Sequence, residues 1–171
     1  MRPAIVSALL LLSAEVLTLA RQSNLDAKLQ EQLRQLFPNA TSFAPKGGEP
    51  PHYKAFAGSR TELAGVAFWT TELEPLERGY DGPIKFLVGM DPKGILTGVI
   101  LVEHHEPYGN FSIEPPRFSA QFRGKNIRDP FKVGGDIYAV SRATITMTSA
   151  ARAVKNSARR VARQLLAPPA F

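Results

Sequence analysis

Two strand-like runs on either side of a four-residue turn constrain the fold of this chain more than any other feature. The runs cover residues 84–90 (Ile-Lys-Phe-Leu-Val-Gly-Met) and 95–103 (Ile-Leu-Thr-Gly-Val-Ile-Leu-Val-Glu), and Asp91-Pro-Lys-Gly94 separates them. Strand-forming residues around a short turn with proline and glycine are typical of a β-hairpin. The sequence therefore predicts an antiparallel strand pair here.

Further strand and helix signals surround this hairpin. Residues 53–57 and 63–71 are rich in β-formers and predict two more strands. Leucines at 25, 29, 33 and 36 share one face of a helix expected over residues 24–37, with Asn24 as its N-cap. A short helix is expected over 115–122, and loops over 45–51, 78–83 and 104–110.

The last predicted element is a long amphipathic helix over residues 147–166. Its apolar positions keep a 3.6-residue spacing, and a basic cluster lies mostly opposite them: Arg152, Lys155, Arg159, Arg160 and Arg163. The cluster is typical of a solvated helix face, or alternatively of a surface for anionic lipid, nucleic acid or an acidic partner. No aromatic residues alternate with these charges, so nucleic acid is not expected as a partner.

Antiparallel strands with helices kept to their flanks predict an α+β fold, with an antiparallel sheet and a long C-terminal helix, rather than a doubly wound one. The length of 171 residues suits one domain. The chain contains no cysteine, which excludes disulfides, thiolate nucleophiles, iron–sulfur clusters and cysteine-based zinc sites. Any redox role therefore requires an organic cofactor or a metal held without thiolates.

The first 20 residues have the pattern of a targeting segment. Arg2 precedes an apolar run over residues 4–14, and Thr18 and Ala20 occupy the small-residue positions before a signal-peptide cleavage site. The alternative is an uncleaved membrane anchor over residues 3–20, although Glu15 fits poorly inside a spanning helix. Both alternatives export a domain that comprises residues 21–171.

Hydroxyl side chains cluster before and within the first turns of the predicted terminal helix. Four of them stand in the segment 136–148: Ser141, Thr144, Thr146 and Thr148. The unsatisfied N–H groups and the dipole of a helix start favour an anion, and Arg142 adds a donor. A phosphate, held loosely or esterified to a hydroxyl, fits this place. The alternative from spacing alone is that Thr146 or Thr148 caps the helix.

This segment resembles the FMN-binding domain family found in subunits of the Rnf complex and of the sodium-pumping NADH:quinone oxidoreductase. It is closer still to the exported N-terminal domain of the nitrous-oxide-reductase regulatory proteins. In that family an Asp-x-x-Ser/Thr-Gly-Ala-Thr type motif receives FMN through a phosphoester on its final threonine. Ser141-Arg-Ala-Thr144 matches the motif, so the resemblance implies covalent FMN on Thr144, attached by a flavin transferase that uses FAD and Mg²⁺.

The match to this motif has two departures. Arg142 replaces the motif's glycine, and the spacing from Asp136 to Ser141 is longer than in the shortest form of the motif. The resemblance makes the whole segment a candidate cofactor site, with these contacts beside Thr144: Ser141, Arg142, Ala143, Thr146 and Thr148.

Two loops extend the resemblance. The segment from Glu77 to Ile84 is similar to the family's Gly-Tyr-x-Gly-Pro-Ile segment, in which a turn explains the glycines but not Tyr80. His104, Glu106 and Gly109 match in part a His-x-Glu-Thr-Pro-Gly loop beside the flavin ring. A metal site at His104 and His105 is not expected, because adjacent residues of an extended segment point to opposite sides. Phe68 and Trp69 are expected in the core.

The resemblance covers roughly residues 35–166 and implies an exported electron carrier rather than a stand-alone enzyme. Such a domain passes electrons between a membrane redox complex and periplasmic partners, either soluble in the periplasm or anchored to the inner membrane through residues 3–20. The protein positions the cofactor, and the flavin performs the redox chemistry. The alternative is a flavin-free structural or binding subunit that keeps the fold, which Arg142 and the altered His104 loop motivate.

Overall fold

A computed structural model describes residues 27–58 and 62–166 of the chain. The chain divides into two compact units, residues 1–32 and 33–171. Of the first unit the structure describes only residues 27–32, which are helical and belong to a helix over residues 27–36. The targeting segment over residues 1–20 and the predicted N-cap Asn24 lie outside the described residues.

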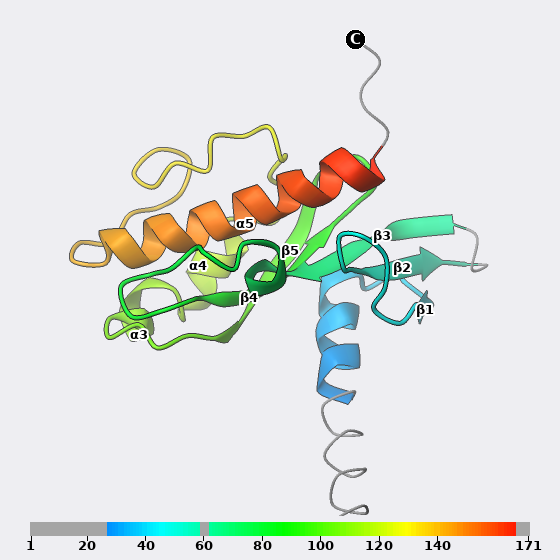
Figure 1. Ribbon diagram of the computed structural model, residues 1–171, viewed down its shortest axis with the longest axis horizontal. Helices are drawn as coiled ribbons and strands as arrows, with labels where there is room; N and C mark the ends of the chain where they lie inside the picture. The colour runs from blue at the N-terminus through cyan, green and yellow to red at the C-terminus, as the bar shows by residue number, and fades with distance from the viewer. Residues whose placement is uncertain (1–26, 59–61, 167–171) are drawn as a thin grey trace, which may run out of the picture. The chain divides into compact units, whose positions relative to one another are not determined.

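The second unit is built on a five-stranded sheet in which every strand pairs antiparallel with its neighbour in the chain (Figure 1). Its strands are β1 (Ser42–Phe43), β2 (Tyr53–Ala57), β3 (Glu62–Trp69), β4 (Lys85–Met90) and β5 (Leu96–Glu103). The predicted strands over 53–57, 63–71, 84–90 and 95–103 are confirmed to within two residues. The two-residue β1 was not predicted.

The predicted hairpin between β4 and β5 is confirmed together with its turn. The carboxylate of Asp91 accepts hydrogen bonds from the backbone N–H groups of Lys93 (2.8 Å) and Ile95 (2.9 Å). Gly94 has a φ of +79°, a conformation that glycine adopts without steric cost. The aspartate and the glycine therefore specify the reversal of the chain through contacts within the turn itself.

One face of the sheet packs against helices and forms the main core. The 22-residue α5 (Thr144–Leu165) runs across it (Figure 1), and the shorter helices are α2 (Thr70–Leu73), α3 (Gly109–Ser112) and α4 (Pro116–Ala120). Phe68, Phe86 and Val88 of the strands meet Met147 and Val154 of α5 in one buried cluster. The α+β fold with a long C-terminal helix is confirmed, whereas α3 was not predicted and begins inside the predicted loop over 104–110.

The other face of the sheet carries glycines that admit the end of the helix over residues 27–36. A Cβ on Gly65 would lie 2.4 Å from Cε1 of Phe37, and one on Gly98 would lie 3.1 Å from Cδ2 of Leu36. Leu36 and Phe37 are both buried. The absence of side chains at these glycines therefore lets Leu36 and Phe37 pack against this face of the sheet.

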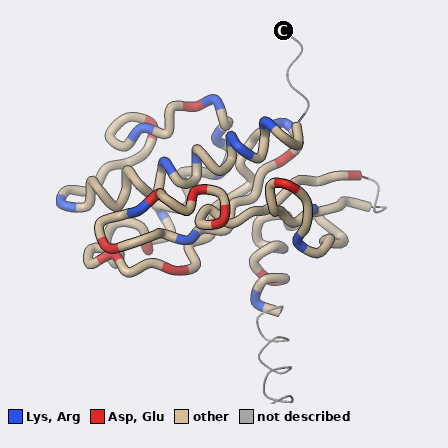
Figure 2. Tube along the Cα trace, in the orientation of Figure 1, with Lys and Arg blue, Asp and Glu red and all other residues tan. Residues whose placement is uncertain are grey.

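Figure 2 shows basic residues along α5. Four of the five predicted ones bind neighbouring segments. Arg152 pairs with Glu77 at 2.8 Å, and Lys155 donates to the Pro130 carbonyl at 3.0 Å. Two further arginines donate to backbone carbonyls: Arg159 to Ile127 and Asp129, and Arg160 to Leu73. The basic face is thus largely a structural attachment for loops. No helix within the described ranges is both long and apolar enough to cross a membrane.

Candidate functional site

Helix α5 begins three residues earlier than predicted, and this shift rearranges the hydroxyl cluster. Thr144 is its first residue, Ala143 is its N-cap, and no side chain of the described residues caps it. Thr146 and Thr148 lie inside the helix, so the alternative that one of them caps it is wrong. The amide N–H groups of the first turn are therefore open to an anion.

The residues at the helix start divide into one buried anchor and three exposed side chains. Ala143 is buried in the core, whereas Ser141, Arg142 and Thr144 are exposed. Arg142 has a φ of +69°, in the left-handed region that only glycine enters freely. This conformation accounts for a glycine at the corresponding place of the family motif and makes Arg142 an energetically costly exception.

Thr146 faces the protein interior instead of the surface. Its side chain is buried and its hydroxyl donates to Oε2 of Glu106. Because a hydroxyl has only one hydrogen to donate, Thr146 has none left for a phosphate in this arrangement. Thr148 is half-buried. Thr144 therefore offers the exposed hydroxyl of the helix start.

Glu106 joins three segments that lie far apart in the chain. Besides Thr146, it accepts hydrogen bonds from the backbone N–H groups of Tyr80 (3.0 Å, Oε2) and Asp81 (2.9 Å, Oε1). Its residue exposure is only 6%. The structure thus brings together Glu106, Tyr80 and Thr146, three predicted site residues, at the first turn of α5.

The contacts of its two ring nitrogens define the tautomer of neutral His104. Its Nδ1 accepts from the backbone N–H of Glu106 at 3.0 Å, so the proton of the neutral ring lies on Nε2, which is 3.2 Å from Oε1 of Glu114. His105 is exposed while His104 is mostly buried. The described part of the chain holds no group of three histidine or carboxylate side chains suited to a metal ion.

Exposed apolar side chains surround the same region. Tyr80 is 70% exposed, Tyr108 47% and Ile145 60%. The Tyr108 ring lies 5.4 Å from that of Phe111. Sequence reasoning missed Ile145 and Phe111, although an isoleucine between two threonines at a helix start is itself a signal of an exposed apolar contact.

The two aromatic residues expected in the core differ. Phe68 is fully buried, as predicted. Trp69 is half-buried on the opposite face, with the Lys85 ammonium 4.9 Å from its ring centroid. Both residues belong to β3, and the indole N–H of Trp69 donates to the Tyr53 hydroxyl of β2 at 3.5 Å.

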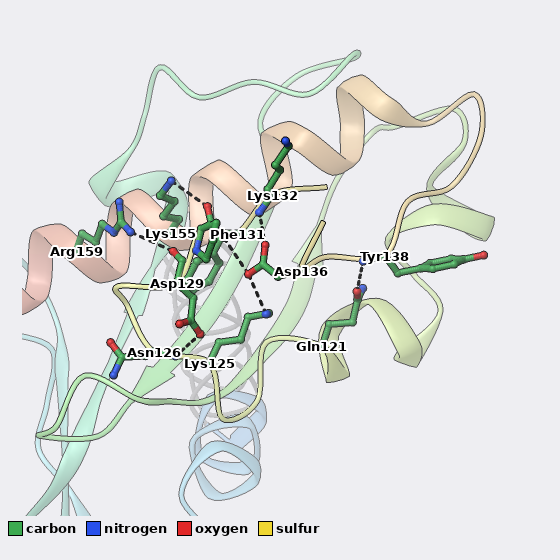
Figure 3. Close-up of polar contacts among 11 residues, drawn as sticks. Gln121, Lys125, Asn126, Asp129, Phe131, Lys132, Asp136, Tyr138, Lys155 and Arg159 are labelled. Atoms are coloured by element: carbon green, nitrogen blue, oxygen red, sulfur yellow. Dashed lines mark hydrogen bonds and ion pairs between the residues drawn. The ribbon is translucent and has the colours of Figure 1, made fainter. Parts of the chain in front are cut away.

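A polar network holds the loop that leads into α5 (Figure 3). The Asp136 carboxylate accepts from the backbone N–H groups of Lys132 and Phe131 and from the Lys125 ammonium, at 2.6, 3.1 and 3.0 Å. Partial burial alone would raise the pKa of Asp136, but these hydrogen bonds outweigh it and hold that pKa below its usual value. Asp136 therefore acts as a structural anchor for the segment that carries Thr144.

Comparison with known proteins agrees with this site. The FMN-binding domain family model matches residues 79–159. The chain is 31% identical over 121 residues to a protein of the ion-translocating oxidoreductase complex of Erwinia tasmaniensis, covering 65% of this chain and 56% of that protein. It is 26% identical over 164 residues to the regulatory protein NosR of Stutzerimonas stutzeri, covering 90% of this chain and 22% of NosR.

The chain thus spans about half of the Erwinia protein and a smaller share of NosR. Tyr80, Glu106 and the segment from Ser141 to Thr146 all fall inside the range matched by the family model. The resemblance inferred from these motifs is therefore confirmed, and residues 79–159 of this chain match the FMN-binding domain family.

Proposed function

We propose that this chain is an exported electron-transfer domain that carries FMN covalently on Thr144 and serves a membrane-associated redox complex. One observation carries the proposal. Thr144 is an exposed hydroxyl at the first position of a 22-residue helix that no described side chain caps, inside the range that matches the FMN-binding domain. FMN, when bound, supplies the ability to accept and return one or two electrons.

The chain's own residues fit the phosphate of this cofactor. The open N–H groups of the first turn of α5 and its dipole favour an anion. Arg142 and Ser141 are exposed beside Thr144 and add a guanidinium and a hydroxyl. Thr146 is committed to Glu106 and Thr148 is half-buried, which favours Thr144 as the residue that a flavin transferase modifies.

The exposed apolar side chains fit the ring of the cofactor. Tyr80, Tyr108 and Ile145 present apolar surface near the helix start, and aromatic side chains of this kind stack on flat ring systems. Their role is to bind and orient the ring and to exclude water from it. His104 and Glu106 support the two loops that carry these tyrosines.

The partners follow from the relatives' names. The Erwinia protein belongs to an ion-translocating oxidoreductase complex in its own organism, and NosR is a regulatory protein. The present chain has no cysteine to hold an iron–sulfur cluster, so its electrons come from and go to other polypeptides. Residues 1–20 would direct the domain to the periplasm as a cleaved signal, or hold it at the inner membrane as an anchor.

Flavin content tests this function. The full chain, co-expressed with a flavin transferase and purified, should show the absorbance bands of flavin, and the flavin-free protein should bind FMN more tightly than riboflavin because only FMN carries the phosphate. Protein without flavin absorbance that also fails to bind added FMN would refute the electron-carrier function. That result would favour the alternative of a flavin-free structural or binding subunit.

A further inference from the structure

We propose that Glu106 is a positioning residue of the flavin site, which acts by fixing the Tyr80 loop to the first turn of α5 and does not itself contact the cofactor. The proposal rests on the proposed function, because it concerns how the same site is built. It also replaces the expectation that Glu106 is a direct cofactor contact.

Three donors already engage both oxygens of the Glu106 carboxylate. Oε1 accepts from Asp81 N–H, and Oε2 accepts from both Tyr80 N–H and the Thr146 hydroxyl. The residue is 6% exposed, and a buried carboxylate requires such donors to remain charged. A carboxylate offers about four acceptor positions, so one remains, and the burial of Glu106 leaves that position little access to a ligand.

The neighbouring Gly79 leaves space for this carboxylate. A Cβ on Gly79 would lie 2.3 Å from Oε1 and 2.6 Å from Cδ of Glu106. Gly79 is not among the glycines with positive φ, so its backbone accepts any residue and only space requires glycine. In addition, Nδ1 of His104 accepts a hydrogen bond from the backbone N–H of Glu106.

The hydrogen bonds of Glu106 control the position of the Tyr80 loop. The Tyr80 ring is 70% exposed, so its own packing does little to fix it. Its position depends on the turn that holds its backbone, in which Gly79 N–H donates to the Gly82 carbonyl at 2.7 Å and Tyr80 N–H donates to Glu106. Glu106 thereby sets the distance between Tyr80 and the helix start that carries Thr144.

The test compares five substitutions made in the full chain, one of them a control, and measures FMN affinity by fluorescence titration. Glu106→Gln should weaken FMN binding by about tenfold, because an amide has a single acceptor oxygen and turns N–H groups toward a backbone donor. Gly79→Ala should act similarly by displacing the carboxylate. Thr146→Val should weaken binding by a smaller factor, and Thr146→Ser should restore it. Gly47→Ala is the matched control, since its Cβ would meet nothing within 4 Å.

A second readout reports the position of the loop without flavin. In the flavin-free protein, the amide proton resonances of Tyr80 and Asp81 should move upfield in Glu106→Gln and Gly79→Ala, because both lose a carboxylate acceptor. The same resonances should stay in place in Gly47→Ala. Thr146→Val preserves the shape of the side chain, so it keeps the proposal open to refutation if Glu106→Gln does not fold.

The outcomes separate the two proposals. Loss of FMN binding in Glu106→Gln, with wild-type binding in both Gly79→Ala and Thr146→Val, would show that Glu106 is a direct ligand and overturn its positioning role. Wild-type binding in all variants would overturn it as well. A wild-type protein that binds no FMN would overturn the proposed function and the role of Glu106 together.

Discussion

Replacing Arg142 by glycine should stabilise the flavin-free protein and weaken its binding of FMN at the same time. Arg142 has a φ of +69° and an exposed side chain. Its backbone conformation is unfavourable for any residue with a Cβ, whereas its guanidinium lies beside the open end of α5. The two effects therefore have opposite signs at a single position.

The magnitude of the stability effect follows from the backbone. A residue with a Cβ in the left-handed region costs about 1–2 kcal/mol relative to its normal conformation. Glycine removes this cost but gains freedom in the unfolded chain, which offsets about 0.5–1 kcal/mol. The expected net gain for Arg142→Gly is therefore roughly 0.5–1 kcal/mol, or a rise in Tm of about 1–4 °C for a domain of this size.

The matched control is Arg142→Ala, which removes the guanidinium and keeps the Cβ. Urea unfolding followed by circular dichroism should rank Arg142→Gly above Arg142→Ala in free energy of unfolding, while titration should show both with FMN affinity weakened to a similar extent. A glycine variant less stable than the alanine variant would refute the conformational argument. Unchanged FMN affinity in both variants would refute the role of the guanidinium in binding phosphate.

Two further predictions concern the loop before α5 and the second face of the sheet. Asp136→Asn should lower stability at neutral pH. The pKa of Asp136 is held below that of the unfolded chain, so its contribution to stability is present above about pH 4 and is lost as the pH falls through the folded value. The difference in urea midpoint between mutant and wild type should therefore be smaller at pH 3.5 than at pH 7. An equal difference at both pH values would contradict this. Gly65→Ala should cost about 1–3 kcal/mol, since its Cβ would lie 2.4 Å from Phe37 Cε1 and 2.5 Å from the Met90 carbonyl oxygen; a wild-type urea midpoint would disprove the close packing there.

The strands and the hairpin could be predicted because their signals are local. Alternating or continuous β-formers mark β2 to β5. The aspartate and glycine of residues 91–94 specify the turn, whose hydrogen bonds lie within residues 91–95. The α+β class follows from these strands and the apolar spacing of α5. The two-residue β1 has no such pattern, because its pairing with β2 depends on the tertiary fold.

The start of α5 could not be placed from the sequence. Three threonines and an isoleucine occupy positions 144–148, and β-branched residues are weak helix formers. The helix begins at Thr144 because Ala143 is buried against the core and its carbonyl accepts the N–H of Met147 at 2.9 Å. This anchoring comes from tertiary packing.

The organisation of the site was also beyond sequence reasoning. Glu106 and Thr146 are 40 residues apart, and their hydrogen bond exists only after the sheet and α5 have packed together. The sequence identified both as site residues through the family motifs, but it did not separate supporting residues from exposed ones. Burial and hydrogen bonding in the structure make that separation, with Thr144 and Arg142 outside and Glu106 and Thr146 inside.

The most direct test of the account is the intact mass of the purified protein and of its Thr144→Val variant, each co-expressed with a flavin transferase. We expect that the wild-type protein carries one covalent FMN increment, that the variant lacks it, and that a Thr146→Val control retains it, because the Thr146 hydroxyl is buried against Glu106. An adduct that persists in Thr144→Val, or its absence from the wild-type protein, would contradict covalent attachment at Thr144.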